Sequence, residues 1–275
     1  MKVPDNLPNE RGSITSPDGT RLGYICIGTG GPLVVCHGSF SSAEDWLPFA
    51  IEMASTHSVY LYDRRGRGSS PYIAADFAID AEVEDLSAMV DLAGSEAAVL
   101  GHSFGGGCAL SFAARNRFSG PLVLYEPRHS AIAPMSRGQR DELERLVATG
   151  DRETALRFAL SHIVGAPADA IAGFHQSPLW EPMCETVHAF AKELRLLDTL
   201  NWQSGDLDAI AGPVTLLVGE HSPVLPEETS PDIALQKLLP GMRTASIPGQ
   251  GHFAFVADPA LMAKMVRLCL SEPRG

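Results

Sequence analysis

Short apolar runs rich in β-branched residues alternate along the chain with segments of helical periodicity. The first two runs, 13–16 and 21–27, flank the turn sequence Pro17-Asp18-Gly19-Thr20 and predict a hairpin. Later runs predict strands at 33–36, 58–62, 97–101, 122–125, 214–218 and 243–247. These runs are continuous rather than alternating, as is typical of parallel strands covered on both faces. The pattern predicts an α/β protein with a doubly wound, mostly parallel sheet of eight strands.

One long segment interrupts the alternation of strands and helices. Elsewhere the helical periodicity links successive strands, as at 81–92 and 259–270. From 129 to 212 the sequence carries helical patterns only, which predict helices at 137–148, 151–162, 168–175 and 183–197. We therefore predict a core made of residues 1–128 and 213–275, with a helical insertion at 129–212 between the sixth and seventh strands.

A strand followed by a small-residue helix carries the strongest chemical signal. The sequence Gly101-His102-Ser103-Phe104-Gly105 ends the run at 97–101 and opens a helix rich in glycine and alanine. Gly-x-Ser-x-Gly in this strand–turn–helix setting is typical of a nucleophile elbow, in which a strained turn lifts the serine hydroxyl above the sheet. The glycines leave room for that turn and for the neighbouring strand. The pattern predicts Ser103 as a catalytic nucleophile.

A second strand end supplies groups that would stabilise an oxyanion. The run at 33–36 leads into His37-Gly38-Ser39-Phe40. The main-chain N–H of Ser39 and that of Phe104, the residue after the nucleophile, are the predicted donors of an oxyanion hole. His37 is interpreted as a histidine that packs in its turn rather than as a catalyst.

A glycine-rich loop near the carboxyl end carries the predicted general base. Gly249-Gln250-Gly251-His252 follows the last predicted strand. A histidine in such a loop can reach over the edge of the sheet to a serine and accept its proton. We therefore predict His252 as the catalytic base.

Charge and hydropathy limit the kinds of partner and the cellular location that we expect. The chain has 21 basic and 33 acidic residues, a formal net charge of −12, which argues against a nucleic-acid partner. No apolar run approaches the roughly 20 residues that a membrane helix needs, and the first residues contain no signal-peptide core. The expected protein is cytoplasmic and has no membrane association.

The sequence gives no support for a metal or cofactor. Its five cysteines are scattered without a C-x-x-C spacing, and its nine histidines include no H-E-x-x-H motif. The cysteines are interpreted as small buried hydrophobic residues in a reducing compartment. We expect no metal site and no cofactor.

Four motifs together resemble those of the α/β-hydrolase superfamily in order and spacing. They are His37-Gly38, the run from Asp63 to Ser70, the serine motif at 101–105, and Gly251-His252. The resemblance covers almost everything from Gly12 to Leu270. It implies an α/β-hydrolase fold in which the insertion at 129–212 is a cap that roofs the active site. Members that cleave epoxides or carbon–halogen bonds carry aspartate at the position of Ser103, so the resemblance disfavours those activities.

The acid of the triad departs from the usual pattern of the superfamily. Members commonly place an aspartate in the loop after the penultimate strand, where this chain has Ser222. Glu126 ends the strand after the nucleophile helix, a position used by some branches, and it keeps the superfamily's order of nucleophile, acid and base. We predict Glu126 as the acid. Glu220, two residues before the vacant position, and the absence of any acid remain the alternatives.

These residues lead to a hypothesis about function. We expect a cofactor-free serine hydrolase that cleaves a carboxylic ester or a lactone through an acyl-enzyme. A carbon–carbon bond hydrolase or a perhydrolase that uses the same triad is one alternative. A non-catalytic small-molecule receptor with the same fold is another, because the usual aspartate is missing. The candidate substrate contacts are Phe40, His102 and Trp180. The predicted cap helices carry no basic run, so the expected substrate is a neutral, apolar small molecule.

Overall fold

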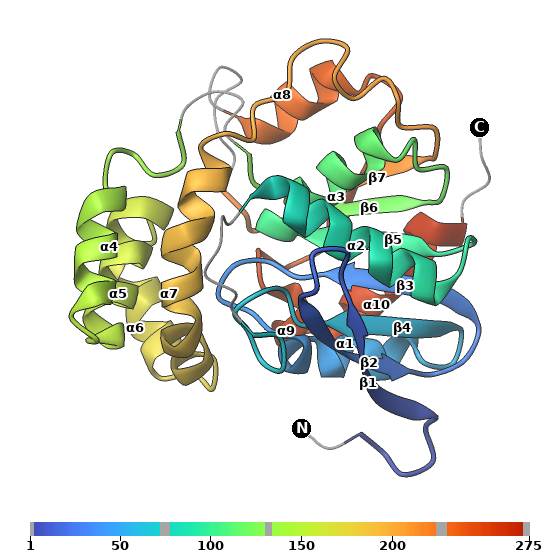
Figure 1. Ribbon diagram of the computed structural model, residues 1–275, viewed down its shortest axis with the longest axis horizontal. Coiled ribbons are helices and arrows are strands. Elements are labelled where there is room, and N and C mark those ends of the chain that lie inside the picture. Colours follow the sequence, from blue (N-terminus) through green and yellow to red (C-terminus); the bar gives the residue numbers. More distant parts are fainter. Residues whose placement is uncertain (1–2, 72–77, 130–133, 224–229, 272–275) are drawn as a thin grey trace.

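An eight-stranded sheet forms the centre of the protein in a computed structural model that describes residues 3–71, 78–129, 134–223 and 230–271 (Figure 1). The spatial order of the strands is β1-β2-β4-β3-β5-β6-β7-β8. The pairs β1–β2 and β2–β4 are antiparallel, and all the other neighbours are parallel. The predicted mostly parallel sheet is thus confirmed. The strands are β1 (Asn9–Thr15), β2 (Arg21–Ile27), β3 (Gly31–Cys36), β4 (His57–Tyr62), β5 (Ala98–His102), β6 (Leu122–Tyr125), β7 (Val214–Gly219) and β8 (Arg243–Ile247).

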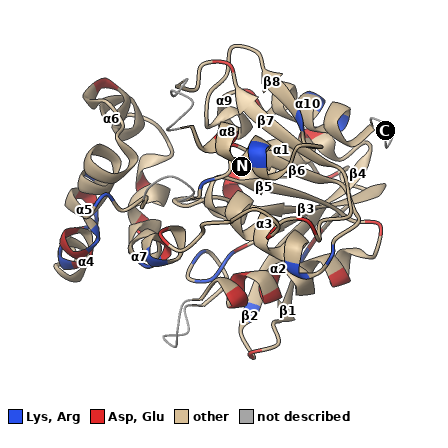
Figure 2. Ribbon diagram, turned by 90° about the horizontal axis from the view of Figure 1, so that it is seen from above, with Lys and Arg blue, Asp and Glu red and all other residues tan. Residues whose placement is uncertain are grey.

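Helices cover both faces of the sheet, because alternate side chains of the buried strands point to opposite sides. Val34 and Val99 lie in one hydrophobic cluster with residues of α2 and α3, whereas Val35 and Leu100 lie in a second cluster with residues of α1 and α10. Figure 2 shows β3, β5 and β6 without charged residues and the charges on the surrounding helices. These helices are α1 (Leu47–Met53), α2 (Ile79–Ala93), α3 (Phe104–Arg115), α8 (Pro231–Leu238), α9 (Ala254–Ala257) and α10 (Pro259–Ser271).

Between β6 and β7 the described part of the chain contains helices and no strand. This segment, the helical insertion, stands to one side of the sheet (Figure 1). Its buried apolar side chains, among them Leu143, Leu156 and Val187, join the cluster that covers the α2–α3 face of the sheet. It consists of α4 (Arg140–Ala148), α5 (Arg152–Phe158), a π-helical turn (Ala159–Val164), α6 (Ala168–His175) and α7 (Trp180–Leu197).

Parts of the predicted domains lie outside the described residues. They are 130–133 at the start of the predicted cap, and 1–2, 72–77, 224–229 and 272–275 of the predicted core. Across the described ranges, no helix combines the length and the apolar character that crossing a bilayer requires.

Candidate active site

Ser103 occupies a sharp turn between the end of β5 and the start of α3. Its backbone angles are φ 54° and ψ −121°, a conformation that L-residues rarely adopt. The turn is held on both sides, because Ser103 N–H donates to the carbonyl of Tyr125 (3.0 Å) and Arg128 N–H donates to the carbonyl of Ser103 (2.9 Å). A Cβ atom on Gly105 would lie 2.1 Å from the carbonyl oxygen of Cys36, so only glycine allows α3 to begin so close to β3. The motif thus presents the serine at the end of the central strands.

The loop that follows β3 passes directly beside this serine. We call residues 37–40 the oxyanion loop. A Cβ atom on Gly38 would lie 2.8 Å from the Cβ of Ser103, so the two backbones approach closely. Among the described residues, neither the N–H of Ser39 nor that of Phe104 has a hydrogen-bond acceptor, which leaves both donors available to a ligand. His37 is buried with both ring nitrogens in use: Nδ1 donates to the carbonyl of Gly38 (2.9 Å) and Nε2 accepts from Arg64 N–H (3.1 Å).

Glu126 and His252 meet at the end of β6. Glu126 Oε2 accepts a hydrogen bond from His252 Nδ1 at 2.5 Å, although the two residues are 126 positions apart in sequence. Glu126 is 6% exposed and has a positive φ of 44°, which turns its side chain out of the strand direction. Within the described chain, Ser103 Oγ makes no hydrogen bond. The bond to Glu126 occupies Nδ1 and leaves His252 Nε2 as the nitrogen available to a nucleophile.

The surroundings of this pair set the charge on each partner. Burial raises the pKa of Glu126, but the hydrogen bonds from His252, Ser222 and Gly219 together lower it below the ordinary value for a glutamate. Burial lowers the pKa of His252 and the bond to Glu126 raises it; with the nearby charge of Arg128, the pKa stays below the ordinary histidine value. At neutral pH the carboxylate is therefore ionised and the imidazole is neutral, as a general base must be.

Two aromatic residues fix the loop that carries His252. The hydroxyl of Tyr125 donates to the carbonyl of Gly251 and accepts from Ala254 N–H (3.1 Å), so it holds the chain on both sides of the histidine. His102 donates from Nε2 to the carbonyl of His252 (3.0 Å). Burial lowers the pKa of His102 well below its ordinary value, so its ring is neutral. Tyr125 was not among the predicted site residues; its place at a strand end, directly before the candidate acid, is the sequence signal that points to it.

Ser222, at the position where the resemblance to the superfamily implies an acid, contacts Glu126 instead of His252. Its hydroxyl donates to Glu126 Oε1 (2.5 Å), and Gly219 N–H donates to the same oxygen (2.8 Å). The alternative acid, Glu220, is exposed and accepts from Gly249 N–H (2.7 Å). Of the two candidate acids, the structure therefore brings Glu126 and not Glu220 against the histidine.

Removing the hydroxyl of Ser222 should have a small effect. We expect Ser222→Ala to lower kcat about fivefold, a difference of about 1 kcal/mol in the barrier, because the bond from Gly219 remains and the carboxylate stays ionised with or without the hydroxyl. Steady-state kinetics on one ester, with Ser222→Thr as the control that keeps the hydroxyl, would measure it. A loss as large as that caused by removing the carboxylate of Glu126 would contradict a supporting role.

The three candidate substrate contacts lie in different surroundings. The ring of Phe40 packs 4.3 Å from that of Phe190 on α7, where the oxyanion loop meets the helical insertion. His102 is 2% exposed and binds the carbonyl of His252. This contact indicates that His102 supports the loop of His252 rather than contacting a substrate. Trp180 is 5% exposed, and its ring lies against His175 and Arg157 inside the helical insertion. Phe40 directly follows Ser39, whose N–H is one of the two predicted oxyanion donors.

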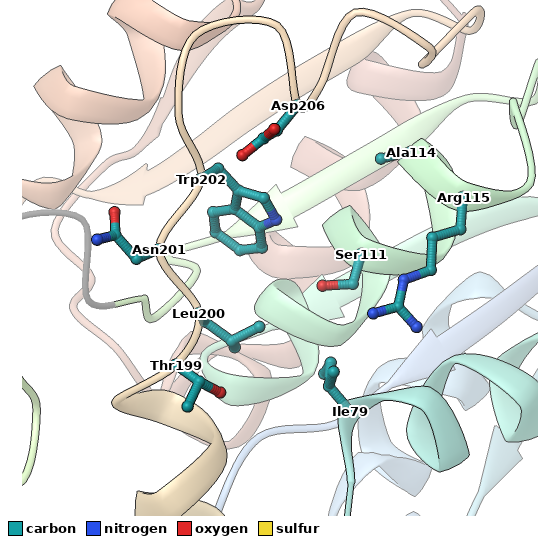
Figure 3. A pocket seen from close by; sticks show the side chains of 9 residues that line it. All are labelled: Ile79, Ser111, Ala114, Arg115, Thr199, Leu200, Asn201, Trp202 and Asp206. Atoms are coloured by element: carbon teal, nitrogen blue, oxygen red, sulfur yellow. The ribbon is translucent and has the colours of Figure 1, made fainter.

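A cavity of about 280 Å³ opens elsewhere, between α2, α3 and the segment that follows α7 (Figure 3). None of Ser103, Glu126 and His252 lines it. Its lining residues are Ile79, Ser111, Ala114, Arg115, Thr199, Leu200, Asn201, Trp202 and Asp206. Among the residues that the structure describes, no group of three or more His, Cys, Asp or Glu side chains is arranged to hold a metal ion.

Comparisons with known proteins agree with this architecture. The model of the alpha/beta hydrolase family matches residues 33–265. The chain is 26% identical over 257 residues to a non-heme haloperoxidase of Rhodococcus erythropolis, which covers 87% of this chain and 92% of that protein. It is 24% identical over 259 residues to the esterase YbfF of Escherichia coli K12, with coverages of 88% and 93%.

Solved structures give the same result. An alpha/beta hydrolase from Sphaerobacter thermophilus superposes with a TM-score of 0.79 and 26% sequence identity, covering 94% of this chain and all of the other. The family match spans most of the chain, and the sheet with its strand–serine–helix turn has the expected form. The resemblance inferred from the motifs is confirmed, and this chain belongs to the alpha/beta hydrolase family.

Proposed function

We propose that the protein is a cofactor-free serine hydrolase that cleaves a carboxylic ester or a lactone. His252 Nε2 takes the proton of Ser103 Oγ as that oxygen attacks the carbonyl carbon, and the N–H groups of Ser39 and Phe104 bind the oxyanion. The tetrahedral intermediate then expels the alkoxide, which receives the proton from His252. Water hydrolyses the acyl-enzyme by the same steps in reverse order.

The hydrogen bond between Glu126 and His252 is the observation that carries this proposal. A carboxylate on Nδ1 fixes the tautomer whose Nε2 accepts a proton, and it stabilises the imidazolium that forms during attack. Glu126 follows β6, the strand paired with the β5 that ends at the nucleophile, so acid and serine are held by adjacent strands.

The proposed substrate is a neutral, apolar small molecule. Two aromatic pairs join the helical insertion to the proposed site: Phe40 with Phe190, and Phe174 with Phe253, the residue after His252 (ring centres 5.1 Å apart). Such contacts favour an apolar acyl or alcohol group. We also propose that the helical insertion acts as the cap over this site.

A fluorophosphonate probe tests the proposal directly. The probe phosphonylates a serine only where a base and an oxyanion hole activate it, so we expect stoichiometric labelling at the peptide that contains Ser103. A panel of acyl esters and lactones of graded chain length would then identify the preferred bond. An unlabelled protein under conditions that label a known serine hydrolase would contradict the proposal and favour a binding protein.

The pH dependence of activity follows from the pKa of His252. Protonated imidazole cannot accept the proton of Ser103, so kcat/KM should rise with pH through the pKa of His252 and level off above it. Because the pKa of His252 is lowered, the midpoint should lie below pH 6.5, the ordinary histidine value. Rates at pH 4.5 to 9 on a neutral ester would measure this midpoint. A midpoint clearly above pH 6.5 would contradict the inferred charge state of His252.

Perhydrolysis is the second candidate, favoured by the name of the haloperoxidase relative. In this reaction hydrogen peroxide instead of water attacks the acyl-enzyme and releases a peracid. Measurement of peracid from an ester in the presence of peroxide separates the two activities. Excess peracid over acid at millimolar peroxide would favour perhydrolysis.

A further inference from the structure

A buried cluster of charged side chains lies under the oxyanion loop. Arg64 binds Glu82 through two hydrogen bonds (2.9 and 2.8 Å) and binds Glu193 through a third (2.7 Å). Arg67 binds the same oxygen of Glu193 at 2.5 Å. All four side chains are fully buried. Two guanidinium groups thus face two carboxylates, so the cluster is neutral overall.

The two arginines belong to the core, but Glu193 comes from the helical insertion. Glu193 lies on α7, 129 residues from Arg64 in sequence. Burial raises its pKa, but Arg67, Arg64 and a hydrogen bond from Ser39 lower it below the ordinary value, so this carboxylate is ionised. A buried charge of this kind is costly unless its partners stay in place, so the position of α7 and that of the arginines depend on each other.

This cluster contacts both parts of the proposed oxyanion hole. The second oxygen of Glu193 accepts a hydrogen bond from Ser39 Oγ at 2.5 Å. Arg64 donates to the carbonyl of His37 (3.2 Å), and its guanidinium lies 4.5 Å from the ring centre of Phe104. The donors expected to bind the oxyanion are the N–H groups of Ser39 and Phe104. Each of these two residues is therefore touched by a member of one buried network.

A second contact on the same face of α7 reinforces this connection. Phe190 lies three residues before Glu193, hence on the same side of the helix, and packs against Phe40 at the end of the oxyanion loop. The backbone of Phe40 has a positive φ of 56°, a conformation that needs support from its surroundings. Residues 39 and 40 are thus both held by α7.

We propose that Glu193 is a positioning residue that ties the oxyanion loop to the helical insertion. In this arrangement the N–H of Ser39 points correctly only when α7 is seated on the core, which couples placement of the insertion to stabilisation of the transition state. The inference rests on the proposed serine-hydrolase function. It adds a residue that touches no substrate and acts through the Ser39 hydroxyl.

The Ser39→Ala variant isolates this connection, because it keeps the main-chain N–H and removes only the hydroxyl bound to Glu193. We expect kcat for an ester and the rate of phosphonylation by a fluorophosphonate to fall about tenfold, with KM within about twofold of wild type. This loss is smaller than the 10² to 10³ expected for complete removal of a donor. Ser39→Thr, which retains a hydroxyl, should recover most of the rate.

Glu193→Gln tests the other end of the same hydrogen bond. It should lower kcat by a similar factor. It should also lower the melting temperature, because the buried guanidinium groups of Arg64 and Arg67 lose the negative charge of Glu193. If both substitutions act through one bond, the double variant should lose little more than the worse single variant. Glu144→Gln is the matched control: it removes the exposed pair that Glu144 forms with Arg195, also on α7 (2.9 Å), and should leave kcat unchanged.

The outcomes separate this inference from the proposed function. An active wild type whose Ser39→Ala variant keeps its kcat and its phosphonylation rate overturns the inference alone. So does a Glu193→Gln variant that melts earlier but turns over normally, or losses that multiply in the double variant. A wild type that is inert to both probe and esters overturns the proposed function, and this inference falls with it.

Discussion

Replacement of Ser103 by alanine is expected to lower kcat by on the order of 10⁴-fold to 10⁶-fold. The variant lacks the oxygen that forms the acyl-enzyme, so only the oxyanion donors and substrate binding remain to accelerate the reaction. The fold should be unaffected, since alanine keeps the Cβ and places no new atoms in the turn. Turnover of an activated ester, together with the melting temperature, would measure both expectations.

Ser111→Ala provides the matched control for this experiment. Ser111 lies on α3, the helix that begins directly after Ser103, and it lines the cavity shown in Figure 3. Its hydroxyl has no part in the proposed chemistry, so the variant should hydrolyse the ester at the wild-type rate. Normal turnover by purified Ser103→Ala would rule out a serine nucleophile at this position.

Glu126→Gln is expected to reduce kcat by on the order of 10⁴-fold. The amide keeps the shape of the carboxylate, but its NH₂ group can donate to His252 Nδ1 and so favours the tautomer with a proton on Nε2. That tautomer cannot accept the proton of Ser103. The loss of the carboxylate also removes the contributions that raise the pKa of His252, so the residual activity should extend to lower pH.

Two further variants test whether Glu126 is the acid of the triad. Glu220→Gln should retain wild-type kcat, because Glu220 bonds Gly249 rather than the histidine. Ser222→Asp in the Glu126→Gln background should recover part of the activity, since position 222 already lies within hydrogen-bond distance of the carboxylate it would replace. If Glu220→Gln proves to be the damaging substitution, the acid has been assigned to the wrong residue.

Local sequence signals were sufficient for most elements and misplaced others for identifiable reasons. The strand predicted at 243–247 coincides with β8. The helix predicted from 137 begins only at Arg140, because Arg137 and Gly138 have positive φ values of 49° and 75° and form a turn. The helix predicted from 183 begins at Trp180, since Pro182 is tolerated in a first turn.

Helix α8 was missed although its start carries a clear signal. Ser230 caps it through a hydrogen bond from Ile233 N–H (3.3 Å), and Pro231 occupies the first helical position. Both are residue types that favour helix starts. Of the residues of α8 only Leu235 is buried, so the helix needs no long stripe of apolar residues. The sequence therefore lacks the helical periodicity from which the other helices were predicted.

The residues of the candidate site differ in how far the sequence could predict them. Ser103, Glu126 and His252 each follow a strand, and parallel strands bring their carboxyl ends to one edge of a sheet, so their positions, together with the resemblance to the superfamily, predicted that they lie close together. Glu193 offered no such signal, because a glutamate in a helical pattern is ordinarily a solvated residue. Its partners Ser39, Arg64 and Arg67 lie 154, 129 and 126 residues away, and only the packing of α7 on the core brings them together.

The backbone conformation of Ser103 has a consequence for protein engineering. A φ of 54° with a ψ of −121° costs an L-residue about 1–3 kcal/mol, a cost that glycine largely avoids. A library selected for heat resistance alone would therefore enrich glycine at the codon that encodes the proposed nucleophile. Directed evolution of this protein for thermostability should therefore keep that codon fixed, or follow each round of heating with a screen for turnover.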